Sequence, residues 1–212
     1  MSAAIDLVLF DVGGVLGSNG WDGEQRAQAV QRFGLDAEDF HYRHAELVGA
    51  LESGEITLDE YLDVTVFCEP RDFSREEFKA FMFAQSTPWP DSIAVVRSLA
   101  RHGVARLATL NNESEALNVH RIELFGLRDL FPVFYSSCWL GVRKPTRAIY
   151  ERVLGMAQAQ PGRTLFVDDR AQNLLPARAL GMRTVQFDSA AQLRAALAAE
   201  GLLGGRESSS ED

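Results

Sequence analysis

The sequence predicts an α/β fold: a doubly wound, Rossmann-like parallel sheet of five strands with a small all-helical insertion. Short runs of Val, Leu, Ile and Phe alternate with helical stretches, which is typical of βαβ units. These runs are apolar on successive residues, as expected for strands that are buried on both faces. Nearly a hundred residues with helical signals only separate the first run from the second. That interval predicts the insertion.

The strands and the insertion divide the chain into a core and a smaller helical unit. The expected strands are Ile5 to Phe10, Arg106 to Leu110, Val133 to Ser136, Leu165 to Val167 and Arg183 to Phe187. With 212 residues, 46% of them apolar, the chain is long enough for a sizeable core. We assign residues 1–17 and 88–203 to the α/β core and residues 18–87 to the helical insertion. Residues 204–212 carry no apolar side chain, so we expect a disordered tail there.

The insertion has clear helical signals. Its apolar residues recur at helical spacing, as in Leu58, Tyr61, Leu62 and Val66. Ser74 and Glu77 have the spacing of a capping box, and Phe73 with Phe78 that of a hydrophobic staple. An insertion after the first strand would lie over the carboxyl ends of the strands, where open α/β sheets bind ligands. The helix that follows the insertion should end at Gly103.

Composition limits the classes of partner. The formal charge of −9 disfavours nucleic acid and anionic lipid, and no stretch is apolar for long enough to span a membrane. Two cysteines, Cys68 and Cys138, are too few for a disulfide framework, so we expect a soluble cytoplasmic protein with both cysteines in its core. The sequence assigns no oligomeric state.

Carboxylates follow two of the expected strands. Asp11 ends the first strand in a Gly-Gly turn, and Asp168 and Asp169 end the fourth. Taken alone, each is better explained as a turn or helix-capping residue. If the two strands are neighbours, however, three carboxylates converge, and such a cluster needs a hard cation such as Mg²⁺.

Two further polar segments could reach the same place. Lys144 stands before a helical run, with Pro145 keeping it outside the helix; such a lysine is usually a solvated surface residue. Here it could instead neutralise a carboxylate and a bound anion. Asn111 and Asn112 end the second strand, where an asparagine could cap the next helix or face an anion.

These segments resemble the four motifs of the haloacid dehalogenase superfamily of phosphohydrolases. Asp11 matches the nucleophile of the first motif, Asn111-Asn112 the second, Lys144 in Gly141-Val142-Arg143-Lys144-Pro145 the third, and Asp168-Asp169 with Asn173 the fourth. The insertion resembles the helical cap of the first subclass. The resemblance covers nearly the whole chain, and four motifs in this order are a far stronger signal than any one of them.

The resemblance implies a Mg²⁺-dependent phosphatase of small phosphorylated metabolites. Asp11 would form an aspartyl-phosphate that water hydrolyses. Asp11, the backbone carbonyl of Gly13, Asp168 (through water) and Asp169 would hold the metal. Lys144 would pair with Asp11 and a phosphoryl oxygen, and Asn111, Asn112 and backbone N–H groups would hold the remaining oxygens.

Two positions depart from the family pattern. Efficient phosphatases of the family carry a second Asp, the general acid and base, where this chain has Gly13. Relatives with Asp-x-Gly in this motif resemble sugar 1-phosphate phosphatases, whose anomeric leaving group needs less help, so a phosphosugar is our first candidate substrate. In the second motif Asn111 stands where the family has Ser or Thr; a shift of register would bring in Leu110 or Thr109.

Two other functions stay open. A 2-haloacid dehalogenase also lacks the second Asp, but such enzymes replace the acidic pair that this chain retains as Asp168-Asp169. A catalytically impaired phospholigand-binding protein is the non-enzymatic alternative. Within the insertion, Asn19, Trp21, His41, Arg43 and His44 could reach a substrate, although no spacing among the histidines indicates a metal site.

Overall fold

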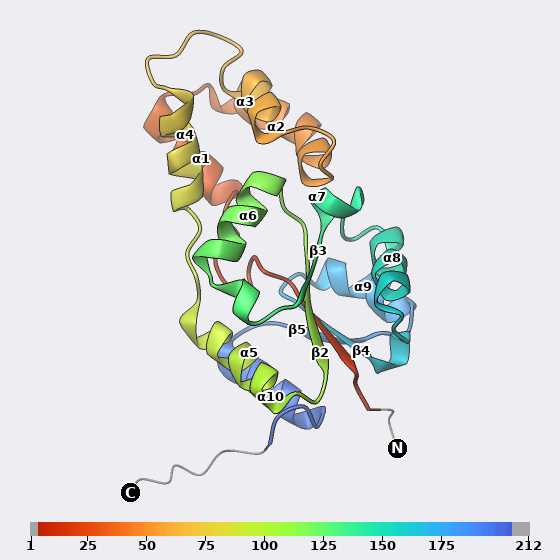
Figure 1. Cartoon of the computed structure of the whole chain (residues 1–212). Helices are drawn as coiled ribbons and strands as arrows, with labels where there is room; N and C mark the ends of the chain where they lie inside the picture. The colour runs from red at the N-terminus through yellow and green to blue at the C-terminus, as the bar shows by residue number, and fades with distance from the viewer. Residues whose placement is uncertain (1–3, 205–212) are drawn as a thin grey trace, which may run out of the picture.

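The structure is a computed structural model that describes residues 4–204, and it contains the five-stranded parallel sheet that the sequence predicts (Figure 1). The strand order is β3-β2-β1-β4-β5, and every pair of neighbouring strands is parallel. The strands are β1 (Leu7–Phe10), β2 (Arg106–Asn111), β3 (Val133–Ser136), β4 (Thr164–Asp168) and β5 (Arg183–Gln186). Because β1 is the central strand, the residue that follows it lies at the middle of one sheet edge.

Helices cover both faces of the sheet. In chain order the helices outside the insertion are α5 (Pro90–His102), α6 (Glu115–Leu124), α7 (Ser137–Leu140), α8 (Arg147–Ala157), α9 (Ala171–Ala179) and α10 (Ala190–Ala199), with short 3-10 helices η1 (Leu127–Asp129) and η2 (Pro161–Arg163). Val8 and Phe10 belong to the apolar cluster that contains α5 and α10, whereas Leu7 and Leu9 belong to the cluster that contains α8 and α9. Successive residues of β1 are thus buried on opposite faces, as the continuous apolar run predicts.

Four helices lie between β1 and α5, at the carboxyl ends of the strands (Figure 1). They are α1 (Gly23–Phe33), α2 (Ala37–Glu52), α3 (Leu58–Thr65) and α4 (Arg75–Ala84). They share an apolar cluster with Phe40, Tyr61 and Phe78 at its centre. The segments that enter and leave this region run side by side, because Ser18 N donates to Thr87 O and Trp89 N to Leu16 O. The assignment of residues 18–87 to a separate cap stays a prediction.

The two cysteines lie outside the apolar clusters. Cys68 is exposed and Cys138 only half-buried, so the prediction that both belong to the core is wrong. Cys68 lies in the turn after α3, beyond the last residue that the helical pattern buries. Of the predicted tail, residues 205–212 lie outside the described part of the chain. Over residues 4–204, no helix combines the length and apolar character needed to cross a bilayer.

Candidate active site

Strand pairing brings the three predicted carboxylates together. Phe10 of β1 lies opposite Val167 of β4, so the residues that follow, Asp11 and Asp168, leave the sheet side by side. One carboxylate oxygen from each of Asp11, Asp168 and Asp169 lies within 4.8 Å of the others. The first and fourth strands are neighbours, so the condition on which the convergence of the three carboxylates depended is met, and a cluster forms at the carboxyl edge of the sheet.

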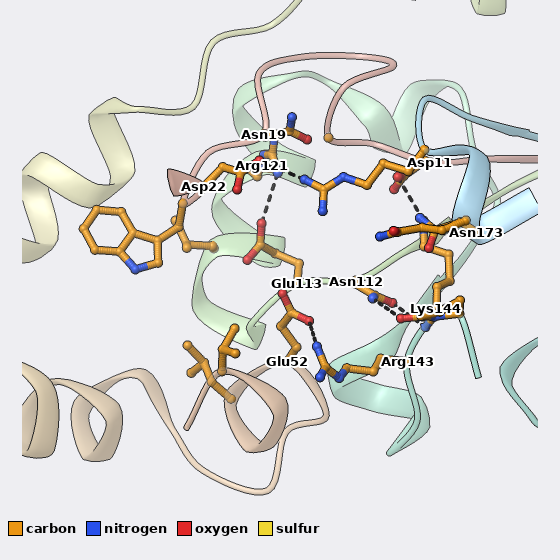
Figure 2. Close-up of a pocket in the computed structure, with 18 of the residues that line it drawn as sticks. Asp11, Asn19, Asp22, Glu52, Asn112, Glu113, Arg121, Arg143, Lys144 and Asn173 are labelled. Atoms are coloured by element: carbon orange, nitrogen blue, oxygen red, sulfur yellow. Dashed lines mark hydrogen bonds and ion pairs between the residues drawn. The ribbon is translucent and has the colours of Figure 1, made fainter. Parts of the chain in front are cut away.

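Lys144 is the cation of this cluster. Its Nζ lies 2.9 Å from Asp11 Oδ2 and 2.7 Å from Asp168 Oδ2, and its side chain is only 1% exposed. The backbone of Lys144 is held by Asn112, whose Oδ1 accepts from Lys144 N and whose Nδ2 donates to Lys144 O, both at 2.8 Å. Lys144 is thus a fixed, buried group and not a solvated surface residue (Figure 2).

The two adjacent aspartates, Asp168 and Asp169, differ in how many hydrogen bonds their carboxylates accept. Asp168 is fully buried and accepts from Arg170 N (2.8 Å) and from Asn173 Nδ2 (3.0 and 3.1 Å), in addition to Lys144. Asp169 is half-buried, and its Oδ1 has no hydrogen-bond partner among residues 4–204. One carboxylate is therefore fully engaged by protein, and the other has an oxygen available for a ligand.

The cluster holds more negative charge than its one lysine offsets. Burial raises the pKa of Asp11 to about 7; Lys144 opposes this rise, and Asp168 and Asp169 add to it. Burial and the neighbouring Asp168 also raise the pKa of Asp169. For Lys144, burial alone would lower the pKa, but Asp11 and Asp168 together outweigh it and raise the pKa. A further cation at this place would relieve the repulsion among the carboxylates.

Asn111 behaves differently from its neighbour Asn112. Its side chain is buried, donates to Asn118 Oδ1 at 2.9 Å and accepts from Ser136 Oγ at 3.0 Å. These contacts tie the end of β2 to α6 and β3, and Asn111 does not line the pocket that opens above the cluster. Neither asparagine caps α6, whose N-cap residue is Ser114. The predicted phosphate contact of the Asn111 side chain therefore gains no support from its position, while Asn112 does line the pocket.

This pocket has a volume of about 380 Å³ and lies between the sheet edge and the helices α1 and α2 (Figure 2). Asp11, Gly13, Lys144 and Asn173 contribute to its floor, and Trp21, His44, Val48 and Leu51 to the opposite side. Of the insertion residues that the sequence left as candidates, Asn19, Trp21 and His44 line the pocket, whereas His41 and Arg43 do not.

His44 enters the pocket as a neutral group. Its Nδ1 lies 2.9 Å from the hydroxyl of Tyr61, which also accepts from Trp21 Nε1 at 3.2 Å. Burial lowers the pKa of His44 to about 4, and the nearby Arg26 contributes to the shift. A neutral imidazole therefore faces the ligand space near pH 7.

Charged residues that the sequence analysis missed surround the pocket. Glu113 pairs with Arg121 at 3.0 Å, and both side chains are almost completely buried. Two other pairs connect the core to the inserted helices: Arg170 with Asp22 at 2.8 Å and Arg143 with Glu52 at 2.9 Å. The partners of the two bridging pairs come from distant parts of the chain, and Glu113 precedes the first residue of α6, so no local pattern singled out these pairs.

Comparisons with known proteins identify the kind of chain to which this geometry belongs. A family model described as haloacid dehalogenase-like hydrolase matches residues 5–181. The chain is 32% identical over 130 residues to bifunctional epoxide hydrolase 2 of Rattus norvegicus, an alignment that covers 59% of this chain and 23% of the rat protein. The chain spans less than half the length of several curated relatives that it matches.

A second relative has nearly the same length. The phosphatase MT3486 of Mycobacterium tuberculosis is 27% identical over 204 residues, which cover 90% of this chain and 91% of that protein. Among solved structures, the HAD family enzyme bt-2542 of Bacteroides thetaiotaomicron, in complex with magnesium and inorganic phosphate, superposes with a TM-score of 0.72. The match covers 87% of this chain and 95% of that one at 21% identity, and it shows a shared fold.

Proposed function

The chain belongs to the haloacid dehalogenase-like hydrolase family, and on that premise we propose that it is a Mg²⁺-dependent phosphatase of small phosphorylated metabolites. The observation that carries the proposal is the buried cluster of Asp11, Lys144, Asp168 and Asp169, of which Asp11 and Lys144 line the floor of a polar pocket. A nucleophilic carboxylate, a fixed cation and an acidic pair are the groups that phosphoryl transfer through an enzyme ester requires.

The donor set fits magnesium. Hard cations of this size prefer carboxylate and carbonyl oxygens, and Asp169 Oδ1 is a buried oxygen without a protein partner within residues 4–204. Asp11, Asp169 and the backbone carbonyl of Gly13 would bind the ion directly, and Asp168, whose oxygens are engaged by Lys144 and Asn173, would act through water. When bound, the ion supplies positive charge that offsets the repulsion between the nucleophile and the phosphate.

The residues of the chain then divide the work of the reaction. One oxygen of Asp11 attacks phosphorus, the P–O bond to the alcohol breaks, and the alcohol leaves behind an aspartyl-phosphate. Water later breaks the bond between Asp11 and phosphorus and releases inorganic phosphate. Lys144 orients Asp11 and favours its ionised form, and its ammonium donates to a phosphoryl oxygen. Asn112 fixes the Lys144 backbone and lies at the pocket wall, where it is a second candidate for contact with the phosphate. Asn111 would contribute only through its backbone.

A small polar ester is the substrate class that suits this pocket. The volume of about 380 Å³ and the three arginines in its lining, Arg121, Arg143 and Arg170, favour a compact, hydrophilic metabolite. A sugar 1-phosphate remains the first candidate, because an anomeric leaving group needs less protonation than an alkoxide and Gly13 carries no acid. The names of the mycobacterial phosphatase and of the phosphate-bound Bacteroides enzyme support phosphate chemistry in general.

The test is hydrolysis of an aryl phosphate by the purified protein, with Mg²⁺ or with chelator. We expect turnover that depends on Mg²⁺ and falls by on the order of 10⁴-fold or more in Asp11→Asn, because the amide cannot attack phosphorus. Asp129→Asn, at an exposed position in η1, is the matched control. A panel of phosphorylated sugars and nucleotides then identifies the preferred leaving group.

The same assay separates the two alternatives. Chloride release from a 2-chloro acid that is insensitive to chelator would identify a dehalogenase, in which Asp11 attacks carbon. Binding of phosphate esters without turnover of either substrate would identify a phospholigand-binding protein.

A further inference from the structure

Resting on the proposed function, we propose that Glu113 is the general acid and base of this site and that Arg121 positions it. The family pattern leaves this role empty, because Gly13 has no side chain where relatives carry the second aspartate. A positioned acid and base typically contributes ~10² to 10⁴-fold to a rate. A different carboxylate that reaches the same space would restore that contribution.

The space beside Gly13 is bordered by Asn19 and Arg121, and Arg121 connects it to Glu113. A Cβ built on Gly13 would lie 3.5 Å from Arg121 Nη1 and 3.1 Å from Asn19 Oδ1. Arg121 Nη1 in turn donates to Glu113 Oε2 at 3.0 Å. From these distances of 3.5 and 3.0 Å, Glu113 Oε2 lies no more than 6.5 Å from the point where a side chain on Gly13 would begin. Figure 2 shows Arg121 between Asn19 and Glu113.

Glu113 is fixed in the pocket wall. Its backbone N–H donates to Ser137 Oγ at 3.0 Å, and its Oε1 accepts from Ser114 N at 3.0 Å. The second guanidinium nitrogen of Arg121, Nη2, donates to the carbonyl of Ser18, in the segment that leads from β1 into the inserted helices. Both Glu113 and Arg121 line the pocket, although their side chains are only 9% and 4% exposed. A carboxyl group that is fixed at the pocket wall loses little freedom when it approaches the leaving oxygen of a bound ester.

The charges around Glu113 are compatible with a carboxyl group that gains and loses a proton. Burial raises its pKa, Arg121 opposes this rise, and the carboxylate of Glu52 at the end of α2 adds to it. Arg121 is the cation that faces Glu113 from α6. The assignment of Glu113 to the pocket wall rests on these contacts and not on its pKa.

Glu113 alone accounts for the proton transfers of both steps, because it gives one proton in the first and takes one back in the second. As Asp11 forms its bond to phosphorus and the ester P–O bond breaks, the proton of the Glu113 carboxyl group passes to the leaving oxygen, and an alcohol departs. Water then attacks the aspartyl-phosphate and gives a proton to the Glu113 carboxylate. The Asp11–phosphorus bond breaks, inorganic phosphate is released, and Glu113 is protonated again. No other reactant is required.

The experiment compares esters with good and poor leaving groups. In Glu113→Gln, we expect hydrolysis of an aryl phosphate to fall by less than ~10-fold and that of an alkyl phosphate by ~10²-fold or more, because only the alkoxide needs a proton. The limb of the pH–kcat profile that reports the acid should disappear. Glu115→Gln, an exposed glutamate two residues further along the chain, is the matched control. Gly13→Asp in the Glu113→Gln background should restore alkyl phosphate hydrolysis, since its Cβ requires only a small shift of the Asn19 side chain.

Equal losses on both esters with an unchanged pH profile would overturn the inference and leave the pair as an anchor for the Ser18 segment. If Glu113→Gln does not fold, a measurement on the wild-type protein alone tests the inference. A shallow dependence of kcat on the pKa of the leaving group across a series of esters supports an internal acid, and a steep dependence overturns one. A wild-type protein that hydrolyses no ester overturns the proposed function itself, and this inference with it.

Discussion

The position of the Asp169 carboxylate depends on the backbone of Gly14 beside it. Gly14 has φ +71°, and a Cβ at this position would overlap the Asp169 carboxylate. The carboxylate of Asp169 therefore packs directly on the Gly14 backbone, in a space that only a residue without a side chain leaves free. This close approach gives the Gly-Gly turn a role beyond chain reversal, because it determines where the free oxygen of Asp169 lies.

We predict that Gly14→Ala lowers Mg²⁺-dependent activity by roughly 10- to 100-fold, the usual effect of displacing a group that orients a metal ligand. Gly103→Ala is the matched control: its φ is +63°, but no atom lies within 4 Å of the added Cβ. That variant should keep full activity and lose only about 1 kcal/mol of unfolding free energy to left-handed backbone strain. The measurements are steady-state kinetics against Mg²⁺ concentration and urea unfolding. Equal activity in the two variants would contradict the prediction.

At the scale of the element, contacts in the first turn of α4 stabilise the start of this helix. Ser74 Oγ accepts from Glu77 N at 3.1 Å, and Glu77 Oε2 accepts from Ser74 N at 2.8 Å. Phe73 stacks on Phe78, with ring centroids 6.1 Å apart. This is the capping box and staple that the sequence predicts, and Phe78 carries the contact into the apolar cluster of the inserted helices.

Ser74→Ala should therefore reduce the unfolding free energy by about 1 kcal/mol, since it leaves an N–H at the start of the helix without its side-chain partner. Thr146, the exposed N-cap residue of α8, makes no side-chain capping bond. Thr146→Ala should change the unfolding free energy by less than ~0.5 kcal/mol. Both values follow from urea unfolding curves. A larger loss in the Thr146 variant would show that capping does not control these helix ends.

At the scale of the whole molecule, cation binding should be linked to folding, because the cluster is assembled from two strands and a loop far apart in the sequence. An unfolded chain does not hold Asp11, Asp168 and Asp169 within reach of one ion. We predict that Mg²⁺ at 100 times its Kd stabilises the folded protein by about 2.7 kcal/mol, measured from thermal or urea unfolding with Mg²⁺ and with chelator. Asp169→Asn should abolish most of this gain.

Asp129→Asn serves as the control for that measurement, because Asp129 is exposed and remote from the cluster in sequence. Its stabilisation by Mg²⁺ should match that of the wild type. The same gain in the Asp169 variant would mean that the ion binds elsewhere, and the assignment of the cluster as the metal site would fail.

Sequence alone predicted the five strands, their parallel arrangement and the capping of α4. It also placed Asp11, Lys144, Asp168 and Asp169 in one site by resemblance to a family. These features are local or recurrent: an apolar run followed by a carboxylate makes a strand end, and parallel neighbours place such ends at one edge. The observed strand bounds differ from the expected ones by at most two residues, and those of β3 are identical.

Packing between distant elements decided the rest. Asn111 turns to Asn118 and Ser136, and Glu113 meets Arg121 beside Gly13, because α6 packs against the ends of β2 and β3. Cys68 is exposed because the chain leaves α3 before reaching it. Side-chain pairing depends on distances between elements, and the pattern along one element carries no information about those distances. The sequence determined which groups stand at the sheet edge, and only the tertiary structure decided which of them face the pocket.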